Sequence, residues 1–338
     1  MKTLYFDNKT HSLCAIDQTK LPQKLQYIYI SDVTTLYDAI KTLKIRGAPA
    51  IGVGAALGLY ACALRFEDNT TKGFAYSFKK TAEIVRSSRP TARNLFYAVD
   101  RMQNAVNRAE GTTVDIMLGE LKAEAQSIFD EDIAMCRCIG EYGAELLKDG
   151  STVLTHCNAG SLCAVEYGTA LSPIYVAEEQ GKRVKVYADE TRPLLQGARL
   201  TAFELSEAGI DTTVICDNMA ASLMQHGKVD IIITGCDRVA ANGDFANKVG
   251  TLSLAINAKH FGVPFYVAAP SSTVDESIPD GSEIIVEQRC GLEISDYWYS
   301  TPMVAPKAKC DYNPAFDVVP RELITGFITE KGVTDSIV

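Results

Sequence analysis

The chain has 338 residues, of which 47% are hydrophobic, so it is long enough for two domains and can bury a large core without disulfide bonds. Its formal net charge of −9 argues against a general affinity for nucleic acid, because phosphate backbones are held chiefly by many Lys and Arg contacts. No segment has the apolar length of a transmembrane helix, so we expect no membrane partner.

The ten cysteines are expected to be reduced thiols. The chain starts MKTLYFDNKTHSL, which lacks an apolar stretch of signal-peptide length, so a cytoplasmic location is expected. No CxxC pair occurs, and Cys136-Arg-Cys138 has no nearby histidine cluster. The sequence therefore predicts no structural zinc site.

The N-terminal part begins with short β-like segments, TLYF, LCAI and YIYI, separated by turn-forming residues. Apolar residues then recur at intervals of three and four, which predicts helices. These patterns run over Val33–Leu43, Ile51–Leu64, Ala75–Val85 and Leu95–Val106, and a longer one over Ile116–Leu147 follows the helix cap offered by GTTVD. We expect a small, mainly helical domain with a β-hairpin over residues 1–112.

From Gly150 onward, short apolar segments alternate with helical stretches at a spacing of roughly 30 residues. The segments are TVLTH at 152, VKVYA at 184, TTVICD at 212, VDIIITG at 229 and PFYVAA at 264. This alternation predicts βα units, and hence a parallel sheet with helices on both faces, over residues 113–338. Such sheets bind ligands at the carboxyl ends of their strands, and a polar cluster ends each segment: HCNAGS, ADETRP, CDNMA, GCDRVAANGD and APSST.

Cys157 follows the first of these strands, in VLTHCNAGS. A lone cysteine at a strand end is most often a packing residue, because free Cys is among the most buried residue types. However, a helix could begin at the following Ala-Gly-Ser, and N–H groups at a helix N-terminus would stabilise a thiolate. His156 could assist, but neighbouring residues on a strand point to opposite faces, so a cap or core role fits it at least as well.

Asp237 follows the most apolar segment, DIIITGC, and is either a helix cap or a placed acid. Burial among the strand ends would favour its protonated form near neutral pH. Cys236 beside it is interpreted as a packing residue. Downstream, ANGDFANKVGTLSLAI places Asn247 and Lys248 where we expect a helix to begin. A cation, an amide and a helix N-terminus would together bind phosphate, and the alternative is a loop with an ordinary cap.

The N-terminal half contains two basic loops. Arg46, Gly47 and Ala48 precede a helix opened by Pro49, so their N–H groups and the Arg46 side chain could bind an anion, while the glycines of IGVGAALGL allow close helix packing. GVGAAL lacks the third glycine of a dinucleotide fingerprint, and there is no GxxxxGK[ST] motif. Arg89, in SRPTARNL before a helix expected from Thr91, could also bind an anion, but taken alone it is better explained as a solvated surface residue.

Several motifs in fixed order resemble the methylthioribose-1-phosphate isomerases of methionine salvage: IRGAPAIG, SRPTARNL, LTHCNAGS, YADETRPLLQGARLTAFEL, CDNMAA, GCDRVAANGDFANKVGT and PFYVAAPSSTVD. The resemblance runs from about Ile45 to the end of the chain, where YNPAFDVVPRELITGFITEKG is also similar to the family's closing segment. It implies an aldose–ketose isomerase of a sugar 1-phosphate, with a small N-terminal domain and a Rossmann-like C-terminal domain. It also implies a homodimer that requires neither metal nor nucleotide.

In a sugar 1-phosphate the anomeric carbon is esterified, so an acid must assist ring opening. The resemblance implies that Asp237 donates a proton to the ring oxygen and that Cys157 handles the proton at C2. Whether the reaction passes through a cis-enediol or a hydride shift is left open. The residues implied to hold the phosphate and hydroxyls are Arg46, Gly47, Ala48, Arg89, Gln196, Asn247 and Lys248.

Three related functions remain as alternatives. Some relatives act on 5-deoxyribose 1-phosphate, and ribose-1,5-bisphosphate isomerases keep the Cys–Asp pair but differ more in the motifs YADETRPLLQGARLTA and AANGDFANKVGT. Regulatory subunits of the translation-initiation guanine-nucleotide exchange factor share the fold but lack the pair, which this chain has. The sequence does not identify the pocket for the 5-substituent.

Overall fold

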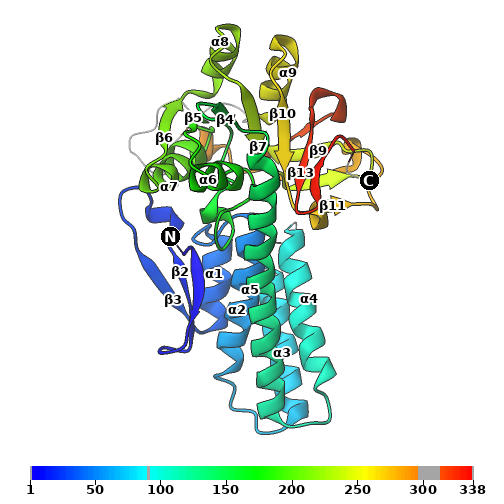
Figure 1. The fold of residues 1–338 in the computed structure, drawn as a ribbon. Helices are drawn as coiled ribbons and strands as arrows, with labels where there is room; N and C mark the ends of the chain where they lie inside the picture. Colours follow the sequence, from blue (N-terminus) through cyan, green and yellow to red (C-terminus); the bar gives the residue numbers. More distant parts are fainter. Residues whose placement is uncertain (1, 90–91, 296–312, 337–338) are drawn as a thin grey trace. The chain divides into compact units, whose positions relative to one another are not determined.

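A computed structural model describes residues 2–89, 92–295 and 313–336 of the chain. It forms two compact units, shown in Figure 1. Unit 1 consists of Met1–Met135 and Ser161–Gly168, and unit 2 of Cys136–Gly160 and Thr169–Val338. The predicted α/β class, with a Rossmann-like sheet and a mainly helical N-terminal part, is confirmed. The domain ranges 1–112 and 113–338 stay a prediction.

Unit 1 begins with a three-stranded antiparallel sheet followed by helices. The strands are β1 (Leu4–Asp7), β2 (Ser12–Ile16) and β3 (Tyr27–Ile30), paired in the order β1-β2-β3. The expected hairpin therefore has a third strand. The helices are α1 (Val33–Lys41), α2 (Ala48–Ala63), α3 (Thr71–Arg86), α4 (Arg93–Arg108) and α5 (Val114–Ala144), which continues into unit 2.

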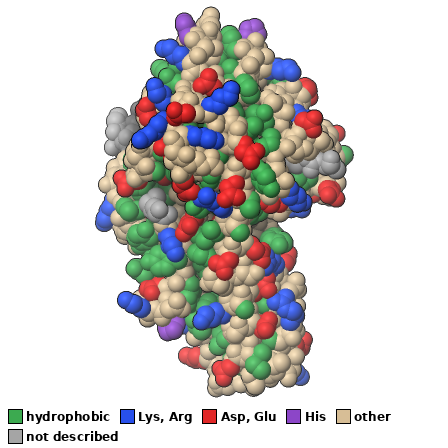
Figure 2. Space-filling view, viewed as in Figure 1, with side chains coloured by type: hydrophobic (Ala, Val, Ile, Leu, Met, Phe, Trp, Pro, Cys, Tyr) green, Lys and Arg blue, Asp and Glu red, His purple; other side chains and the backbone are tan. Residues whose placement is uncertain are grey.

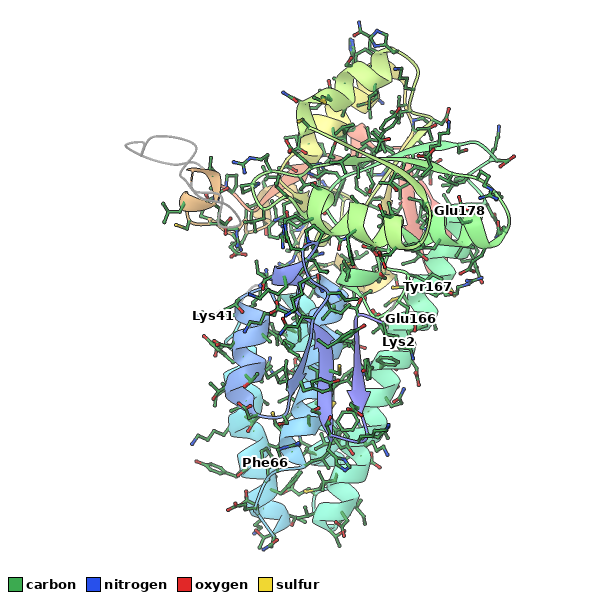
Figure 3. The ribbon with its side chains drawn as sticks, turned by 90° about the vertical axis from the view of Figure 1, so that its left-hand side faces the viewer. Lys2, Lys41, Phe66, Glu166, Tyr167 and Glu178 are labelled. Atoms are coloured by element: carbon green, nitrogen blue, oxygen red, sulfur yellow. The ribbon has the colours of Figure 1, made fainter. Side chains whose placement is uncertain are left out.

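Helix α2 lies at the centre of unit 1 because its sequence is apolar on every side, unlike the amphipathic helices around it. Two of its glycines permit close packing, as the sequence suggested. A Cβ at Gly52 would come 3.0 Å from the carbonyl oxygen of Asn94 in α4, and one at Gly58 would come 2.6 Å from the side chain of Leu36 in α1. Phe66, which follows the end of α2 and is labelled in Figure 3, packs edge-on against Phe74.

Unit 2 contains a seven-stranded sheet in the order β14-β13-β10-β7-β4-β5-β6. Its strands are β4 (Thr152–Thr155), β5 (Lys185–Asp189), β6 (Asp211–Ile215), β7 (Ile231–Thr234), β10 (Phe265–Ala268), β13 (Gly326–Thr329) and β14 (Gly332–Thr334). The five predicted segments are all present and pair in parallel, and only β14 is antiparallel to its neighbour.

Helices cover both faces of this sheet, as predicted. Figure 1 shows α6 and α7 on one side and α8 and α9 on the other. Their bounds are α6 (Ser172–Glu179), α7 (Ala202–Glu207), α8 (Ala220–Gln225) and α9 (Thr251–Phe261). Apolar side chains of α8 and α9, including Met224 and Leu254, pack with buried strand residues such as Ile232 and Phe265 to form the core on that face.

A second sheet in unit 2 was not predicted. It has the order β11-β8-β9-β12, with β11 (Val274–Asp275), β8 (Arg238–Ala240), β9 (Phe245–Lys248) and β12 (Phe316–Val319). The segment expected to be a loop before a helix is a β-hairpin, β8–β9, whose outer partner β12 is distant in sequence. Local patterning does not reveal such a pairing, because each strand is short and gains its partner only on folding.

Within the described ranges, no helix is both long and apolar enough to cross a membrane. Figure 2 shows acidic and basic side chains interspersed over the visible face of the molecule. A nucleic-acid binding protein is expected to gather Lys and Arg on one face. The described side chains on this face show no such separation of charge.

Helix α5 carries a buried acid within unit 1. Asp132 is 4% exposed and accepts a hydrogen bond of 2.8 Å from the backbone N–H of Val165. Burial raises the pKa of Asp132 to about 7, against a smaller lowering by that hydrogen bond. The folded protein therefore binds this proton more tightly than the unfolded chain, and its stability falls as pH rises from the ordinary value of 3.8 to about 7.

We expect Asp132→Asn to stabilise the protein at about pH 8, by at most roughly 4 kcal/mol, because the amide avoids a buried charge while its oxygen can still accept from Val165. The gain should be much smaller at about pH 5, where Asp132 already holds its proton. Calorimetric melting at both pH values measures the effect, and Asp130→Asn, at an exposed position of the same helix, is the control. An equal change in Tm at both pH values would contradict the prediction.

Candidate active site

The candidate site of unit 2 lies where the strand order of the main sheet reverses. Strand β4 has β5 on one side and β7 on the other, so the chain winds outward from β4 in both directions. Loops after two such strands diverge and leave a crevice at the carboxyl edge of the sheet, the usual ligand site of open α/β sheets. Cys157 follows β4 at this point, and Asp237 follows β7.

Cys157 is 8% exposed and has a left-handed backbone, with φ of +65°. Its backbone N–H donates to Thr191 Oγ1 at 2.8 Å, and its carbonyl accepts from Thr201 Oγ1 at 2.6 Å. Thr191 itself has φ of +66°, which is a genuine outlier for a β-branched residue. Strained backbone of this kind persists where surrounding structure enforces it, typically at functional sites. The geometry therefore favours a functional role for Cys157 over simple packing.

The helix expected directly after Cys157 is absent from the described residues of that loop. Ser161–Cys163 form only a short 3-10 turn, and the next α-helix is α6. The carbonyl of Ala159 accepts from the N–H groups of Thr169 and Leu171, so the chain after Cys157 forms a loop that these two hydrogen bonds close. Stabilisation of a Cys157 thiolate by a helix N-terminus at Ala-Gly-Ser was therefore a wrong expectation.

The base of this loop is held by a buried polar network. Asn158 donates from Nδ2 to Thr201 Oγ1 and to Glu204 Oε1, and Tyr175 donates to the other oxygen of Glu204. Gly160 packs against the same carboxylate, where a Cβ would come 2.3 Å from Oε1. The network fixes the backbone on the C-terminal side of Cys157, in addition to the two hydrogen bonds that Cys157 itself makes through its backbone.

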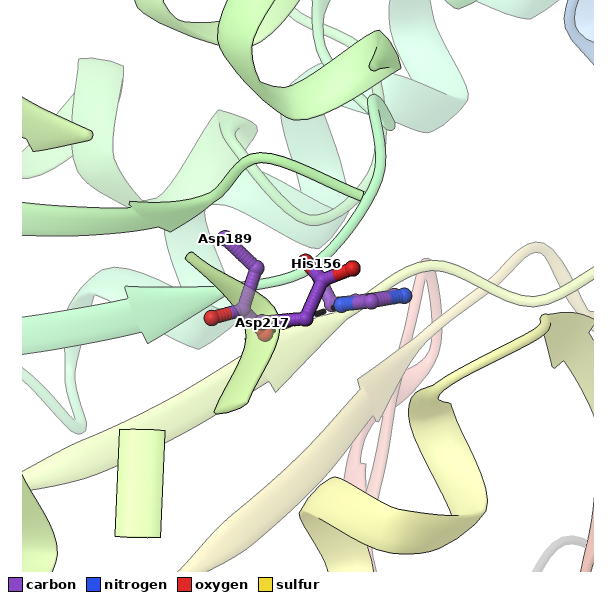
Figure 4. A group of neighbouring side chains, drawn as sticks. All are labelled: His156, Asp189 and Asp217. Carbon is purple, nitrogen blue, oxygen red and sulfur yellow. Dashed lines mark hydrogen bonds and ion pairs between the residues drawn. The ribbon is translucent and has the colours of Figure 1, made fainter. Parts of the chain in front are cut away.

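His156 lies in the core, which confirms the core role over that of a helper for Cys157. The side chain is 1% exposed, and its Nδ1 lies 2.9 Å from Asp189 Oδ2 while its Nε2 lies 3.0 Å from the carbonyl oxygen of Val249. Burial lowers the pKa of His156, but the hydrogen bond to Asp189 and the charge of that carboxylate outweigh burial, so its pKa is raised. Figure 4 shows the ring beside Asp189 and Asp217.

These three side chains bring their ligand atoms within 4.8 Å of one another, which raises the question of a metal. Both oxygens of Asp217 accept backbone hydrogen bonds, from Thr191 and Arg192. Both ring nitrogens of His156 also have partners, so of these groups only Asp189 Oδ1 lacks one among the described residues. The cluster fits a hydrogen-bond network rather than a metal centre.

Gln196 is 9% exposed and immediately precedes a π-helical turn, Gly197–Thr201. Its Oε1 is buried and has no hydrogen-bond partner in the described part of the chain. A buried amide oxygen without a donor costs free energy, so a donor from a ligand is expected there. Single-turn π-helices are frequent at functional sites. This geometry agrees with the substrate-binding role implied for Gln196, which stays a prediction.

Asp237 precedes strand β8, and its backbone N–H donates to the carbonyl of Ala246 at 2.9 Å. Its side chain is exposed, so the expected burial among the strand ends is not found. Asp237 lies in the short connection between β7 and β8, just before the hairpin β8–β9, which the sequence did not predict. The adjacent Cys236 is a packing residue, as interpreted: burial raises the pKa of its thiol well above the ordinary value.

Asn247 and Lys248 are the last two residues of strand β9 rather than the start of a helix. Helix α9 begins at Thr251, after Gly250 with φ of +106°. Asn247 donates to Thr251 Oγ1 at 3.0 Å, which ties the strand end to the helix N-terminus. Lys248 donates to the carbonyl of Ala315 and lies 4.6 Å from the centre of the Phe316 ring. Asn247, Lys248 and the N-terminus of α9 are neighbours in the chain, and their expected role in binding phosphate stays a prediction.

The remaining predicted residues belong to unit 1. Gly47 caps α2 with φ of +90°, and a Cβ there would come 2.5 Å from the backbone of Cys163. Ala48 is the first residue of α2, after Arg46. Arg89 is half-buried in the loop before α4, which begins at Arg93, while Pro90 and Thr91 lie outside the described residues. Their part in a site with Cys157 stays a prediction.

Sequence reasoning did not single out Asp189, Thr191, Thr201 or Asp217. The available signal was that Asp189 and Thr191 lie in the polar cluster ADETRP, and Asp217 in CDNMA, each at the carboxyl end of a predicted strand. Thr201 lies inside a helical segment and gave none. Its contact with Cys157 exists only because the π-helical turn packs against the loop after β4.

The sequence pattern of the Initiation factor 2 subunit family matches residues 44–336. A methylthioribose-1-phosphate isomerase from Parabacteroides distasonis is 52% identical over 328 residues, which are 97% of this chain and 98% of that protein. A 5-deoxyribose 1-phosphate isomerase from Moorella thermoacetica is also 52% identical, over 94% of this chain and 90% of its own.

Solved structures agree with these sequence matches. The 5-methylthioribose 1-phosphate isomerase of Pyrococcus horikoshii has a TM-score of 0.92 and 42% identity, covering 98% of this chain and 92% of its own. A structure named as translation initiation factor eIF-2B, subunit delta, from A. fulgidus has a TM-score of 0.90 and 43% identity, covering 98% and 95%. The resemblance seen in the motifs is thereby confirmed, and the chain belongs to the initiation factor 2 subunit family.

Proposed function

We propose that this protein is an aldose–ketose isomerase that converts S-methyl-5-thioribose 1-phosphate to S-methyl-5-thioribulose 1-phosphate in methionine salvage. The observation that carries the proposal is the strained, doubly anchored backbone of Cys157 at the reversal of the strand order. The identity to a methylthioribose-1-phosphate isomerase over nearly the whole chain supports the substrate class.

The reaction is internally balanced. An acid donates a proton to the ring oxygen and opens the ring, C1 then gains a hydrogen, and C2 loses one together with its hydroxyl proton to become a ketone. The phosphate ester stays on C1. We assign the acid to Asp237, whose exposed side chain is accessible to a substrate, and the handling of the C2 proton to Cys157. Since C1 is reduced as C2 is oxidised, the reaction needs no outside oxidant or reductant.

The binding groups follow from the same proposal. Asn247 and Lys248 would hold the phosphate with the N-terminal end of α9, and the buried Oε1 of Gln196 would accept a hydrogen bond from a sugar hydroxyl. Arg46, Gly47, Ala48 and Arg89 of unit 1 are proposed to complete the site. We further propose that the protein acts as a cytoplasmic homodimer, as the family resemblance implies.

A second candidate substrate is 5-deoxyribose 1-phosphate, because a relative named for that activity is as similar in identity as the methylthioribose enzyme. The two sugars differ only at C5, and an apolar pocket distinguishes such groups by only about 1 to 3 kcal/mol. The deciding experiment compares kcat/KM for methylthioribose, deoxyribose and ribose 1-phosphates, the last with and without a 5-phosphate, in the presence of a chelator. Turnover of none of them would favour a regulatory subunit.

Lys248→Ala is expected to raise KM more than it lowers kcat, because the phosphate is bound in both the ground state and the transition state. Steady-state kinetics with the preferred sugar 1-phosphate measures the split. Lys185→Ala, at the amino end of β5, removes an equal charge away from the carboxyl edge and should leave KM unchanged. An unchanged KM in Lys248→Ala would remove this lysine from the phosphate site.

A further inference from the structure

The ring of His156 contacts two acceptors and no donor among the described residues. Asp189 Oδ2 lies 2.9 Å from Nδ1, and the carbonyl oxygen of Val249 lies 3.0 Å from Nε2. A peptide carbonyl can only accept, and an ionised carboxylate can only accept. A neutral imidazole carries one N–H, so it satisfies one of these contacts and turns a lone pair toward the other oxygen. Both hydrogen bonds form together only if the pair holds an additional proton.

The surrounding carboxylates indicate that this proton belongs to the ring. Asp217, from the turn after β6, accepts from two backbone N–H groups, and Asp317, from β12, accepts from those of Gly250 and Leu252. The carboxylate of Asp189, from β5, has His156 as its only hydrogen-bond partner in the described structure. A buried carboxylate needs a paired cation or donors to remain ionised, and among the described residues the ring is the only group that supplies either to the carboxylate of Asp189.

The position of the ring links the two halves of the proposed site in unit 2. His156 directly precedes Cys157, and Val249 directly follows Lys248. The ring also packs on the backbone of Gly250, where a Cβ would come 2.7 Å from ring carbon Cε1. Moving or discharging the ring would therefore disturb the strand end that carries Asn247 and Lys248 as well as the N-terminus of α9.

We propose that His156 is a buried imidazolium that acts as a positioning residue, donating to Asp189 and to the Val249 carbonyl and thereby holding the phosphate-binding segment against the end of β4. The contribution to binding rests on the proposed isomerase function, whereas the charge state of the ring does not. Burial lowers the pKa of His156, but the hydrogen bond and charge of Asp189 and the charge of Asp217 outweigh it, so the pKa is raised, in agreement with the assignment. Burial also raises the pKa of Asp189, whereas the hydrogen bond and charge of His156 lower it, so the contact between the two groups favours the charged ring and the ionised carboxylate together.

Isotope-edited NMR of the histidine ring nitrogens in the full-length protein tests the charge state directly. At about pH 8, which is well above the ordinary pKa of a histidine side chain, both nitrogens of His156 should still have the chemical shifts of protonated ring nitrogens. Asp189→Asn should return the His156 ring to the neutral form at the same pH. An unprotonated shift at either His156 nitrogen in the wild-type protein overturns the proposal, whether or not the protein is an isomerase.

Kinetics test the positioning role. His156→Gln keeps an amide that can donate but loses the charge and cannot span both acceptors as the ring does, so KM for the sugar 1-phosphate should rise by roughly tenfold, the factor that corresponds to one charged hydrogen bond. The rise should be larger than the fall in kcat, and His226→Gln is the surface control. An unchanged KM in His156→Gln with a doubly protonated wild-type ring would overturn the positioning role and leave the isomerase proposal intact.

Discussion

Cys157→Ser is expected to abolish measurable turnover, with kcat reduced by about 10²- to 10⁴-fold or more, because a hydroxyl is a far poorer base than a thiolate at neutral pH. The fold should be retained. The change in volume is small, and both anchors of the residue, Thr191 and Thr201, bind its backbone rather than its sulfur. Steady-state kinetics and thermal melting of the variant separate loss of chemistry from loss of structure.

Cys236→Ser is the matched control for this experiment. Its thiol is a packing group next to Asp237, so the substitution should lower Tm more than kcat. If Cys157→Ser keeps a kcat near that of the wild type, the catalytic role is wrong and packing explains the residue.

Thiol alkylation supplies an independent measurement. Alkylation should inactivate the enzyme, and bound substrate should protect the enzyme from it. The experiment uses a Cys290→Ser background, because Cys290 is an exposed thiol among the described residues and would otherwise react first. Inactivation that is insensitive to substrate would point to a different cysteine.

Asp237→Asn is expected to separate binding from chemistry. The amide preserves the shape of the side chain and can still contact a substrate hydroxyl, but it has no transferable proton to open the ring. Calorimetric titration with substrate should therefore show binding close to that of the wild type, while turnover falls by about 10²- to 10⁴-fold. Because the Asp237 side chain is exposed, the bound substrate itself must exclude water from the acid for proton transfer.

Asp211→Asn is the control, since Asp211 is an exposed carboxylate at the amino end of β6, the edge opposite the site. It should leave both binding and turnover unchanged. Retained activity in Asp237→Asn would rule out the acid role, and joint loss of binding and activity would make Asp237 an anchor for a hydroxyl.

The sequence predicted those helices and strands that show a recognisable apolar pattern within their own residues. Helices α1, α3, α4 and α5 carry the apolar period of a helix with one buried face, and α2 and the parallel strands are marked by apolar segments of helix or strand length. The positions of Cys157 and Asp237 at strand ends followed from the same patterns, because a strand that stops at a polar cluster places that cluster at the carboxyl edge.

Only the tertiary structure determined the features that depend on contacts between residues distant in the chain. In the second sheet β12 pairs with β9 across a long sequence separation, so Lys248 ends a strand rather than beginning a helix. The left-handed backbone of Cys157 is enforced by Thr191 and Thr201, each more than 30 residues away. The charge of a buried ring is likewise set by the acceptors that folding brings to it, which no local pattern encodes.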